Sequence, residues 1–306
     1  MTGSVFTHTA LLYATAAEYL DATVTYVRAA REEDRPVLVA VPGADLERIR
    51  AGVGGGDDDG VTWWDAEATS RNPGRIIPAL LDYCARHAGR RPALLGQPMW
   101  VGRTGAERAA VAVHEALVNR AFVGVDATAL CPYDTAGLHS SDVAAARRTH
   151  PSLAGIAGLA ASADYAPDSA LAERNAPLVA PAAATAMPYD AIGALRWLRR
   201  AVGERAVAMG LSEDRAADLE FVVTELATNT LRHSGGSGVL HLWADGDALV
   251  CQVSDGGFLH DPLTGRIPVE PTAERGRGLL LTHQMCDLVE VFTGPAGTVI
   301  RVRMGR

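Results

Sequence analysis

Over the first 150 residues, short runs of apolar and β-branched side chains alternate with stretches in which apolar positions recur at helical spacing. The short runs predict strands at 36–41, 61–65, 92–96 and 127–133. The helical spacing predicts helices at 16–31, 44–51, 74–88 and 104–121. Strands that alternate with helices are typical of an α/β fold, so we predict a mainly parallel sheet flanked by helices.

The second half of the chain has a different order of patterns. Segment 160–188 is rich in Ala and Pro and poor in large apolar residues, which predicts a linker. The patterns after it are two helices, two strands, a helix and two strands, at 189–210, 212–235, 238–245, 248–257, 276–289, 290–294 and 297–304. This order predicts an α+β layer with helices on one sheet face. We therefore predict a first domain at 1–160, a linker at 161–187 and a second domain at 188–306.

Composition and charge are consistent with two folded domains and narrow the function classes. The chain has 306 residues, of which 48% are hydrophobic, and a formal net charge of −8. That charge argues against the broad basic surface that direct nucleic-acid binding requires. We find neither a signal-peptide pattern nor a run of about 18 apolar residues, so we expect a cytoplasmic protein without a membrane segment.

The four cysteines are far apart in the sequence and form no C-x-x-C pair. They are Cys84, Cys131, Cys251 and Cys286. This spacing indicates neither a zinc site nor a disulfide framework, and buried reduced thiols are the expected state.

The helix predicted at 213–233 carries polar residues within an apolar pattern. Leu219, Val222 and Leu226 recur at helical spacing and predict a stripe that packs on the sheet. Glu225 and Asn229 are four residues apart and therefore project side by side. Taken alone, such a pair usually indicates a solvated helix face.

The motifs that follow this helix change the interpretation. "ELATN" and "RHSGG" within 225–236 are followed by "SDGG" at 254–257, "GRGL" at 276–279 and "GTVIRV" at 297–302. This ordered set resembles the GHKL, or Bergerat-type, ATP-binding domain, and specifically the branch of bacterial anti-sigma-factor serine kinases. The resemblance covers about 188–305 and implies a two-layer α+β fold that binds ATP and Mg²⁺.

The resemblance assigns roles in binding the nucleotide base and the metal ion. It implies that Asn229 is the protein ligand of Mg²⁺, which suits a hard ion that prefers oxygen ligands. Asp255 would accept a hydrogen bond from the adenine amino group, because an ionised carboxylate only accepts. Gly257 would let the base approach the backbone, and Thr298 would help to hold adenine through its hydroxyl.

Further residues would hold the triphosphate or perform the transfer. Gly276 and Gly278, at a predicted helix start, expose backbone N–H groups to an anion, and Arg277 adds charge. His233 also falls among the cofactor-binding positions, and 258–275 would form a lid. Glu225 corresponds to the general base, which would orient or deprotonate a Ser or Thr hydroxyl of a protein partner, or water.

The sequence leaves three possible activities open for such a domain. The leading interpretation is a serine/threonine protein kinase whose partner is a sigma factor or an anti-anti-sigma antagonist protein. A module that binds ATP and sequesters its partner without chemistry is the second. A histidine kinase is the third, with His114 in "VAVHEALVNRAF" as acceptor, although no proline follows at the usual spacing. The sequence leaves dimerisation open.

The first domain carries a second ordered set of motifs. These are "HTALLY" (8–13), "RNPGR" (71–75), "QPMWVGR" (97–103), "HEALVN" (114–119), "CPYD" (131–134) and "THP" (149–151). The set is similar to the MEDS sensory domain and implies a RecA-like parallel-sheet sandwich over about 5–165. Gln97 stands where related sequences usually have Glu, which puts any ligand role of that carboxylate in doubt. Nucleotide hydrolysis here is not expected, because "GVGGGDDDG" (52–60) lacks the Lys of a P-loop.

Polar and aromatic side chains in these motifs predict a pocket for a small molecule, as such pockets combine apolar walls with a few polar groups. The candidates are His8, Trp100, Glu115, Asn119, Cys131, Tyr133 and Asp134. The alternative is that Asn119, Tyr133 and Asp134 simply satisfy buried hydrogen bonds at strand ends. A redox role for Cys131 would require a low pKa and exposure, which the sequence does not reveal.

Overall fold

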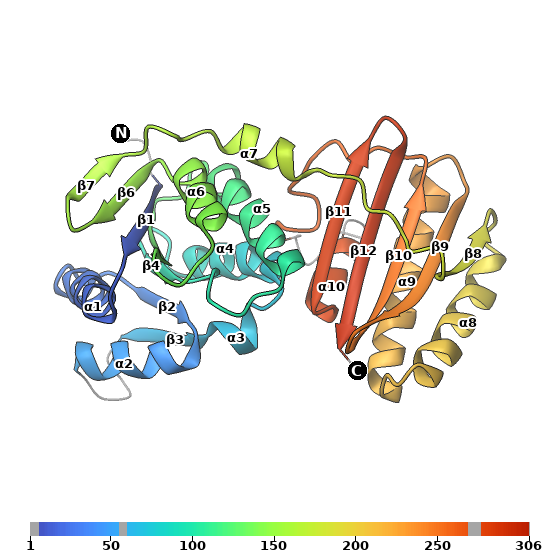
Figure 1. Cartoon of the computed structure of the whole chain (residues 1–306), viewed down its shortest axis with the longest axis horizontal. Helices are drawn as coiled ribbons and strands as arrows, with labels where there is room; N and C mark the ends of the chain where they lie inside the picture. The colour runs from blue at the N-terminus through green and yellow to red at the C-terminus, as the bar shows by residue number, and fades with distance from the viewer. Residues whose placement is uncertain (1–5, 55–59, 269–276, 306) are drawn as a thin grey trace. The chain divides into compact units, whose positions relative to one another are not determined.

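The computed structural model describes residues 6–54, 60–268 and 277–305. The chain divides into two compact units, Met1–Arg174 and Asn175–Arg306 (Figure 1). Within the described residues, no helix combines the length and apolar character needed to cross a membrane.

The N-terminal unit alternates strands and helices along most of its length. Its strands are β1 (Thr7–Tyr13), β2 (Val37–Val41), β3 (Val61–Asp65), β4 (Ala93–Gly96), β5 (Thr128–Asp134), β6 (Ser152–Gly155) and β7 (Gly158–Ala161). Its helices are α1 (Ala16–Glu32), α2 (Gly43–Val53), α3 (Ala66–Thr69), the 3-10 turn η1 (Pro73–Arg75), α4 (Ile76–Arg86), α5 (Gly105–Ala121), α6 (Ser140–Thr149) and α7 (Pro167–Arg174). The strands join in the order β3-β2-β4-β5-β1-β6-β7. All neighbouring pairs are parallel except β6 with β7, so the predicted α/β fold is confirmed.

Helices cover both faces of this sheet because alternate strand residues point to opposite sides. On one face, Leu11 of β1 and Leu130 of β5 pack with the buried side chains of α1 and α2. On the other face, Ala10, Cys131 and Tyr133 pack with side chains from α5 and α6. His8 is two residues before Ala10 in β1, so it shares this second face, and the alternation determines which residues can form a site there.

In the described part of the C-terminal unit, a five-stranded sheet packs with three helices. The strands are β8 (Thr185–Tyr189), β9 (Gly238–Asp245), β10 (Ala248–Asp255), β11 (Leu288–Gly294) and β12 (Gly297–Gly305), and the helices are α8 (Ala194–Ala208), α9 (Glu213–His233) and α10 (Gly278–Met285). The order is β11-β12-β10-β9-β8, and every pairing is antiparallel. One apolar core joins the sheet to all three helices, which confirms the predicted two-layer α+β fold.

The Ala/Pro-rich segment is more ordered than its composition indicates. It contains helix α7 and, at its end, the first residues of strand β8, which pairs with β9. The Asn175 side chain exchanges two hydrogen bonds with the backbone of Thr293, at 2.7 and 3.0 Å. Arg301 Nη2 donates to the Val179 carbonyl at 2.9 Å. These contacts tie residues 175–189 to the C-terminal sheet.

Candidate functional site

Helix α9 places Glu225 and Asn229 at the edge of its buried stripe. Ser212 caps the start of the helix by accepting a hydrogen bond from the Arg215 N–H at 3.3 Å. The stripe includes Leu219, Val222 and Leu226, all buried in the core. Glu225 is half-buried and Asn229 is exposed one turn later, so their polar groups face away from the centre of the stripe.

Glu225 lies against the first residue of helix α10. A Cβ atom added to Gly278 would lie 2.5 Å from Glu225 Oε2, so a side chain there would displace the carboxylate from this position. The structure therefore brings the "ELATN" and "GRGL" motifs together at a helix start, where backbone N–H groups have no partner within the helix. Arg277 precedes α10 in helical backbone conformation, whereas Gly276 lies outside the described residues.

Asp255 is held by a chain of hydrogen bonds at the end of β10. The Thr230 hydroxyl donates to Asp255 Oδ2 at 2.8 Å, and the Gly257 N–H donates to Oδ1 at 2.8 Å. Tyr189 donates in turn to Thr230 Oγ1 at 3.0 Å. Each carboxylate oxygen keeps a further acceptor site, so Asp255 can still bind an amino group. Asp255 and Tyr189 both line an open hollow beside Gly238.

Gly257 follows the end of β10, and Thr298 lies at the start of β12, opposite Asp255 of β10. A Cβ atom at Gly257 would lie 2.2 Å from Ser234 Oγ, so the backbone there passes close to the end of α9. Thr298 Oγ1 donates to the Gly257 carbonyl at 3.0 Å and lies 2.9 Å from Thr293 Oγ1. The Thr298 hydroxyl proton is therefore engaged within the protein, and its oxygen remains available as an acceptor.

Two basic residues belong to the segments that carry these motifs, and the sequence analysis did not single out the second of them. His233 is exposed in the last turn of α9. Arg266, within the segment assigned to the lid, is buried, and burial lowers its pKa to about 10. Its Nη1 atom has no hydrogen-bond partner among the described residues. Thr230 and Tyr189 were also not predicted, because a Thr in a buried stripe and a Tyr beside a Pro-rich segment carry no distinctive pattern.

The residue types suit a magnesium nucleotide. Asn229 offers an exposed amide oxygen, which a hard cation accepts as a ligand. A side chain at Gly257 would overlap Ser234, and one at Gly278 would displace the Glu225 carboxylate. The C-terminal unit therefore offers an amide oxygen at Asn229, an acceptor carboxylate at Asp255 and a helix start at Gly278.

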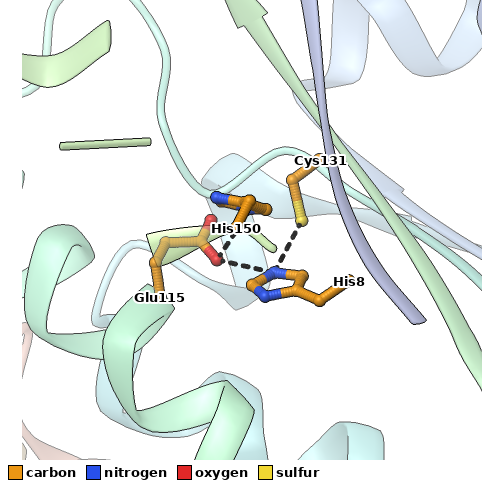
Figure 2. A group of neighbouring side chains, drawn as sticks. All are labelled: His8, Glu115, Cys131 and His150. Atoms are coloured by element: carbon orange, nitrogen blue, oxygen red, sulfur yellow. Dashed lines mark hydrogen bonds and ion pairs between the residues drawn. The ribbon is translucent and has the colours of Figure 1, made fainter. Parts of the chain in front are cut away.

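In the N-terminal unit, three of the predicted pocket residues converge with a fourth residue that was not predicted. His8, Glu115, Cys131 and His150 are buried and point toward one another (Figure 2). Glu115 Oε2 lies 3.1 Å from His8 Nε2 and 3.5 Å from His150 Nε2, and Cys131 Sγ lies 3.5 Å from His8 Nε2. His150 was part of the "THP" motif, but its position between a helix and a strand gave no sign of its partners.

Two more predicted residues form hydrogen bonds with members of this group. Asn119 Oδ1 accepts from His8 Nδ1 at 3.1 Å, and the Tyr133 hydroxyl donates to Glu115 Oε1 at 2.7 Å. Burial, reinforced by the nearby His8, lowers the pKa of His150 to about 3, so this imidazole is neutral at pH 7. Burial also raises the pKa of the Cys131 thiol well above its ordinary value.

The last two pocket candidates, Trp100 and Asp134, belong neither to the cluster nor to its hydrogen-bond partners. The Arg103 guanidinium stacks over Trp100 at 3.5 Å from the ring centre. Asp134 Oδ1 accepts from the Ala136 and Gly137 N–H groups and so shapes a turn. Gln97 is buried and accepts a hydrogen bond from Tyr19 at 2.8 Å.

A cavity adjoins the buried cluster. His8, Glu115 and Cys131 contribute polar groups to a wall that is otherwise mostly apolar, and Gln97 lies at the same cavity. Its volume of about 40 Å³ accommodates roughly three water-sized molecules. His114 also lines it and is buried, so the imidazole that the histidine-kinase interpretation requires as acceptor is enclosed in the first unit.

Comparisons with known proteins agree with both resemblances. Residues 7–151 match the family described as the MEthanogen/methylotroph, DcmR Sensory domain, or MEDS, and residues 190–304 match the Histidine kinase-like ATPase domain. No curated protein matches the chain. A similar solved structure is "The crystal structure of the RsbU and RsbW domains of Rv1364c from Mycobacterium tuberculosis", at 19% identity and a TM-score of 0.31. That match covers 41% of this chain and 33% of the other, about a third of its length. The chain therefore contains a region at 7–151 that matches the MEDS sensory domain, followed by a region at 190–304 that matches the histidine kinase-like ATPase domain.

Proposed function

We propose that this protein is a signalling regulator whose ATPase domain uses Mg·ATP to phosphorylate a Ser or Thr of a partner protein. The domain type implies ATP binding. The partner we propose is a sigma factor or an anti-anti-sigma antagonist. The MEDS domain would control the reaction in response to a small molecule bound near its buried cluster.

The observation that carries this proposal is the approach of the Glu225 carboxylate to Gly278 at the start of α10. A phosphate group bound at this helix start would be held by backbone N–H groups. Glu225 would then lie beside the transferred group, where it can orient and accept the proton of an attacking hydroxyl. No described residue donates a hydrogen bond to the Glu225 carboxylate. A purely structural role therefore gives no reason for a carboxylate at position 225.

Binding and transfer are assigned to different residues. Asn229 would supply an oxygen ligand, and the bound Mg²⁺ would neutralise charge on the phosphates. Asp255, fixed through Thr230 and the Gly257 N–H, would select the nucleotide base. Arg266 is a further candidate for charge near the phosphates, since it is a buried guanidinium within the lid segment.

The experiment compares ATP affinity with phosphate transfer in two variants of the full chain. Asn229→Ala should abolish Mg²⁺-dependent ATP binding. Glu225→Gln should keep ATP affinity within a few-fold and lower transfer by about 10²–10⁴-fold, the usual contribution of a general base.

A matched control is available on the same helix. Glu220 is also half-buried in α9, and it pairs with Arg199 at 3.2 Å instead of approaching α10. Glu220→Gln should leave both ATP affinity and transfer unchanged. Unchanged Mg²⁺-dependent affinity in Asn229→Ala would overturn the site assignment, and transfer by Glu225→Gln at the wild-type rate would overturn the base assignment.

A further inference from the structure

The strongest unexplained feature is a set of four buried donor atoms in the MEDS domain. They are Nε2 of His8, Oε2 of Glu115, Sγ of Cys131 and Nε2 of His150, and all lie within 4.8 Å of one another (Figure 2). The residues come from β1, α5, β5 and the end of α6, so four elements converge on one point. All four residues belong to the N-terminal unit. An inference about them is therefore independent of the function proposed for the ATPase domain.

The hydrogen bonds around His8 fix which of its nitrogens faces the cluster. Asn119 Nδ2 donates to the carbonyls of Glu115, Ala116 and Thr149, at 3.0, 3.4 and 2.8 Å. The amide oxygen of Asn119 must therefore face His8, and it accepts a proton from Nδ1 at 3.1 Å. In neutral His8, Nε2 then carries a lone pair directed at the other donors.

His150 and Glu115 are oriented in the same way. His150 Nδ1 lies 2.9 Å from the Ala146 carbonyl, so it carries the proton and Nε2 carries the lone pair. The Tyr133 hydroxyl donates a hydrogen bond to Glu115 Oε1 at 2.7 Å. The other carboxylate oxygen, Oε2, is directed at His8 and His150. Neither His150 Nε2 nor Glu115 Oε2 has a hydrogen-bond partner among the described residues.

Without a cation, this arrangement is electrostatically unfavourable. A carboxylate oxygen faces two imidazole lone pairs at 3.1 and 3.5 Å in a buried site. Buried polar atoms are normally paired, and a buried charge usually has a partner or coordinates a metal. A divalent ion would satisfy all four donors at once, and with Cys131 as thiolate and Glu115 ionised the buried site would be neutral overall.

The spacing and chemistry of the donors identify the class of ion. Zinc bonds of about 2.0–2.3 Å arranged as a tetrahedron place neighbouring donors roughly 3.3–3.6 Å apart. Three of the six donor–donor separations are 3.1, 3.5 and 3.5 Å, and all four donors lie within 4.8 Å of one another. Two imidazoles, one thiolate and one carboxylate suit a borderline ion of the zinc class, whereas Mg²⁺ and Ca²⁺ prefer oxygen alone.

We propose that His8, Glu115, Cys131 and His150 form a tetrahedral binding site for a divalent transition-metal ion of the zinc class. Asn119, Tyr133 and the Ala146 carbonyl orient its ligands, as outer-shell partners do in metal sites. His8, Glu115 and Cys131 also line the adjoining cavity, so the ion lies at the cavity wall.

The test is a titration of the chelator-treated full chain with Zn²⁺, followed by Co²⁺ as a spectroscopic probe. The wild type should bind one Zn²⁺ per chain, and its Co²⁺ form should show tetrahedral absorption bands together with a thiolate-to-cobalt charge-transfer band. Cys131→Ser should lose the charge-transfer band, and Glu115→Gln should weaken Zn²⁺ binding by more than about 100-fold. Asn119→Ala, which removes only an orienting group, should weaken it by about 10–100-fold.

The matched control is Cys84→Ser, since Cys84 is a buried free cysteine of the same unit outside the cluster. It should keep both the stoichiometry and the charge-transfer band. If one variant fails to fold by circular dichroism, the wild-type Co²⁺ spectrum and the remaining variants still decide the matter. The proposal is overturned if the wild type binds no Zn²⁺ at micromolar concentration, or if binding persists at full affinity in both Cys131→Ser and Glu115→Gln.

Discussion

At the scale of single residues, the candidate ATP site depends on close approaches that a sequence only partly reveals. Gly257 and Gly278 could be singled out because their motifs resemble those of a known family. Only the structure shows which atoms a side chain at these positions would meet. They belong to Ser234 for Gly257 and to Glu225 for Gly278. Thr230 and Tyr189 could not be predicted, because their role comes from the distance to Asp255 and not from any spacing in the chain.

The Thr230 hydroxyl should stabilise the ATPase domain by satisfying the Asp255 carboxylate. Thr230→Val leaves the half-buried Asp255 without this donor, and the lost hydrogen bond should cost about 0.5–1.5 kcal/mol. Hydrogen exchange of the β10 amides in the full chain measures the loss. Thr224→Val is the control, because Thr224 donates only to the Glu220 carbonyl of its own helix. Equal losses in the two variants would contradict the assignment.

Close packing at Gly257 makes a second prediction at this scale. Gly257→Ala should lower the free energy of unfolding of the C-terminal unit by about 1–3 kcal/mol, because the new methyl group overlaps Ser234. Ser234→Gly in the same chain removes the overlapping atoms and should recover more than half of the loss in thermal melting. Gly193→Ala should have little effect, since a Cβ there meets nothing within 4 Å. Absence of recovery in the double variant would show that the overlap is not the cause.

At the scale of elements, the periodicity of apolar residues predicted most helices and strands. It did not predict strand β8, whose Ala/Pro-rich sequence gives no sign that it pairs with another strand. Four strands of the N-terminal sheet were predicted, at 36–41, 61–65, 92–96 and 127–133, close to β2, β3, β4 and β5, whereas β1, β6 and β7 were not predicted. Strand β8 escaped prediction because its sequence, "TAMPY", continues an Ala/Pro-rich stretch. Only its pairing with β9 and the burial of Met187 and Tyr189 make it a strand of the core.

Strand β8 should be required for the stability of the ATPase domain. A fragment that begins at residue 190 loses the buried Met187 and Tyr189, at about 1.5–3 kcal/mol for each large side chain, and exposes the edge of β9. A fragment that begins at Asn175 retains both. Urea unfolding of the two fragments should give a clearly lower midpoint for the shorter one, and equal midpoints would contradict the role of β8.

The start of helix α5, which carries Glu115 and Asn119, should show acid-sensitive stability. Thr104 and Glu107 form a reciprocal cap, and Arg71 Nε donates to Glu107 at 2.7 Å. Burial alone would raise the pKa of Glu107, but hydrogen bonds from Thr104 and Arg71 outweigh it and hold the pKa below its ordinary value. The contribution to stability is therefore present above the unfolded pKa and is lost as pH falls through the folded pKa.

Glu107→Gln tests this prediction through hydrogen exchange of the α5 amides, corrected for intrinsic rates, between pH 7 and pH 4. The variant should lower the opening free energy by about 0.5–2 kcal/mol at pH 7, the usual worth of a helix cap. The difference from wild type should shrink toward acidic pH. A difference that stays constant over this range would show that the carboxylate charge makes no contribution.

At the scale of the whole molecule, the sequence predicted two types of domain but not the convergence of the buried cluster. The ordered motifs carried both resemblances, which the family comparisons confirm. The cysteine spacing indicated no zinc site, because each of the four donors comes from a different element and no two ligands form a local motif. Sheet register and helix packing bring them together, and the sequence alone does not specify either to within a bond length.

The central claim is that the chain transfers phosphate from ATP to a partner protein. Its most direct test is incubation of the purified full chain with γ-labelled ATP and Mg²⁺, with and without candidate antagonist proteins, followed by acid and base treatment of labelled bands. Acid-stable label should appear on an added partner, and Glu225→Gln but not Glu220→Gln should abolish it. Acid-labile label on the chain itself, or ATP binding with no label on any partner, would rule out transfer to a Ser or Thr of a partner.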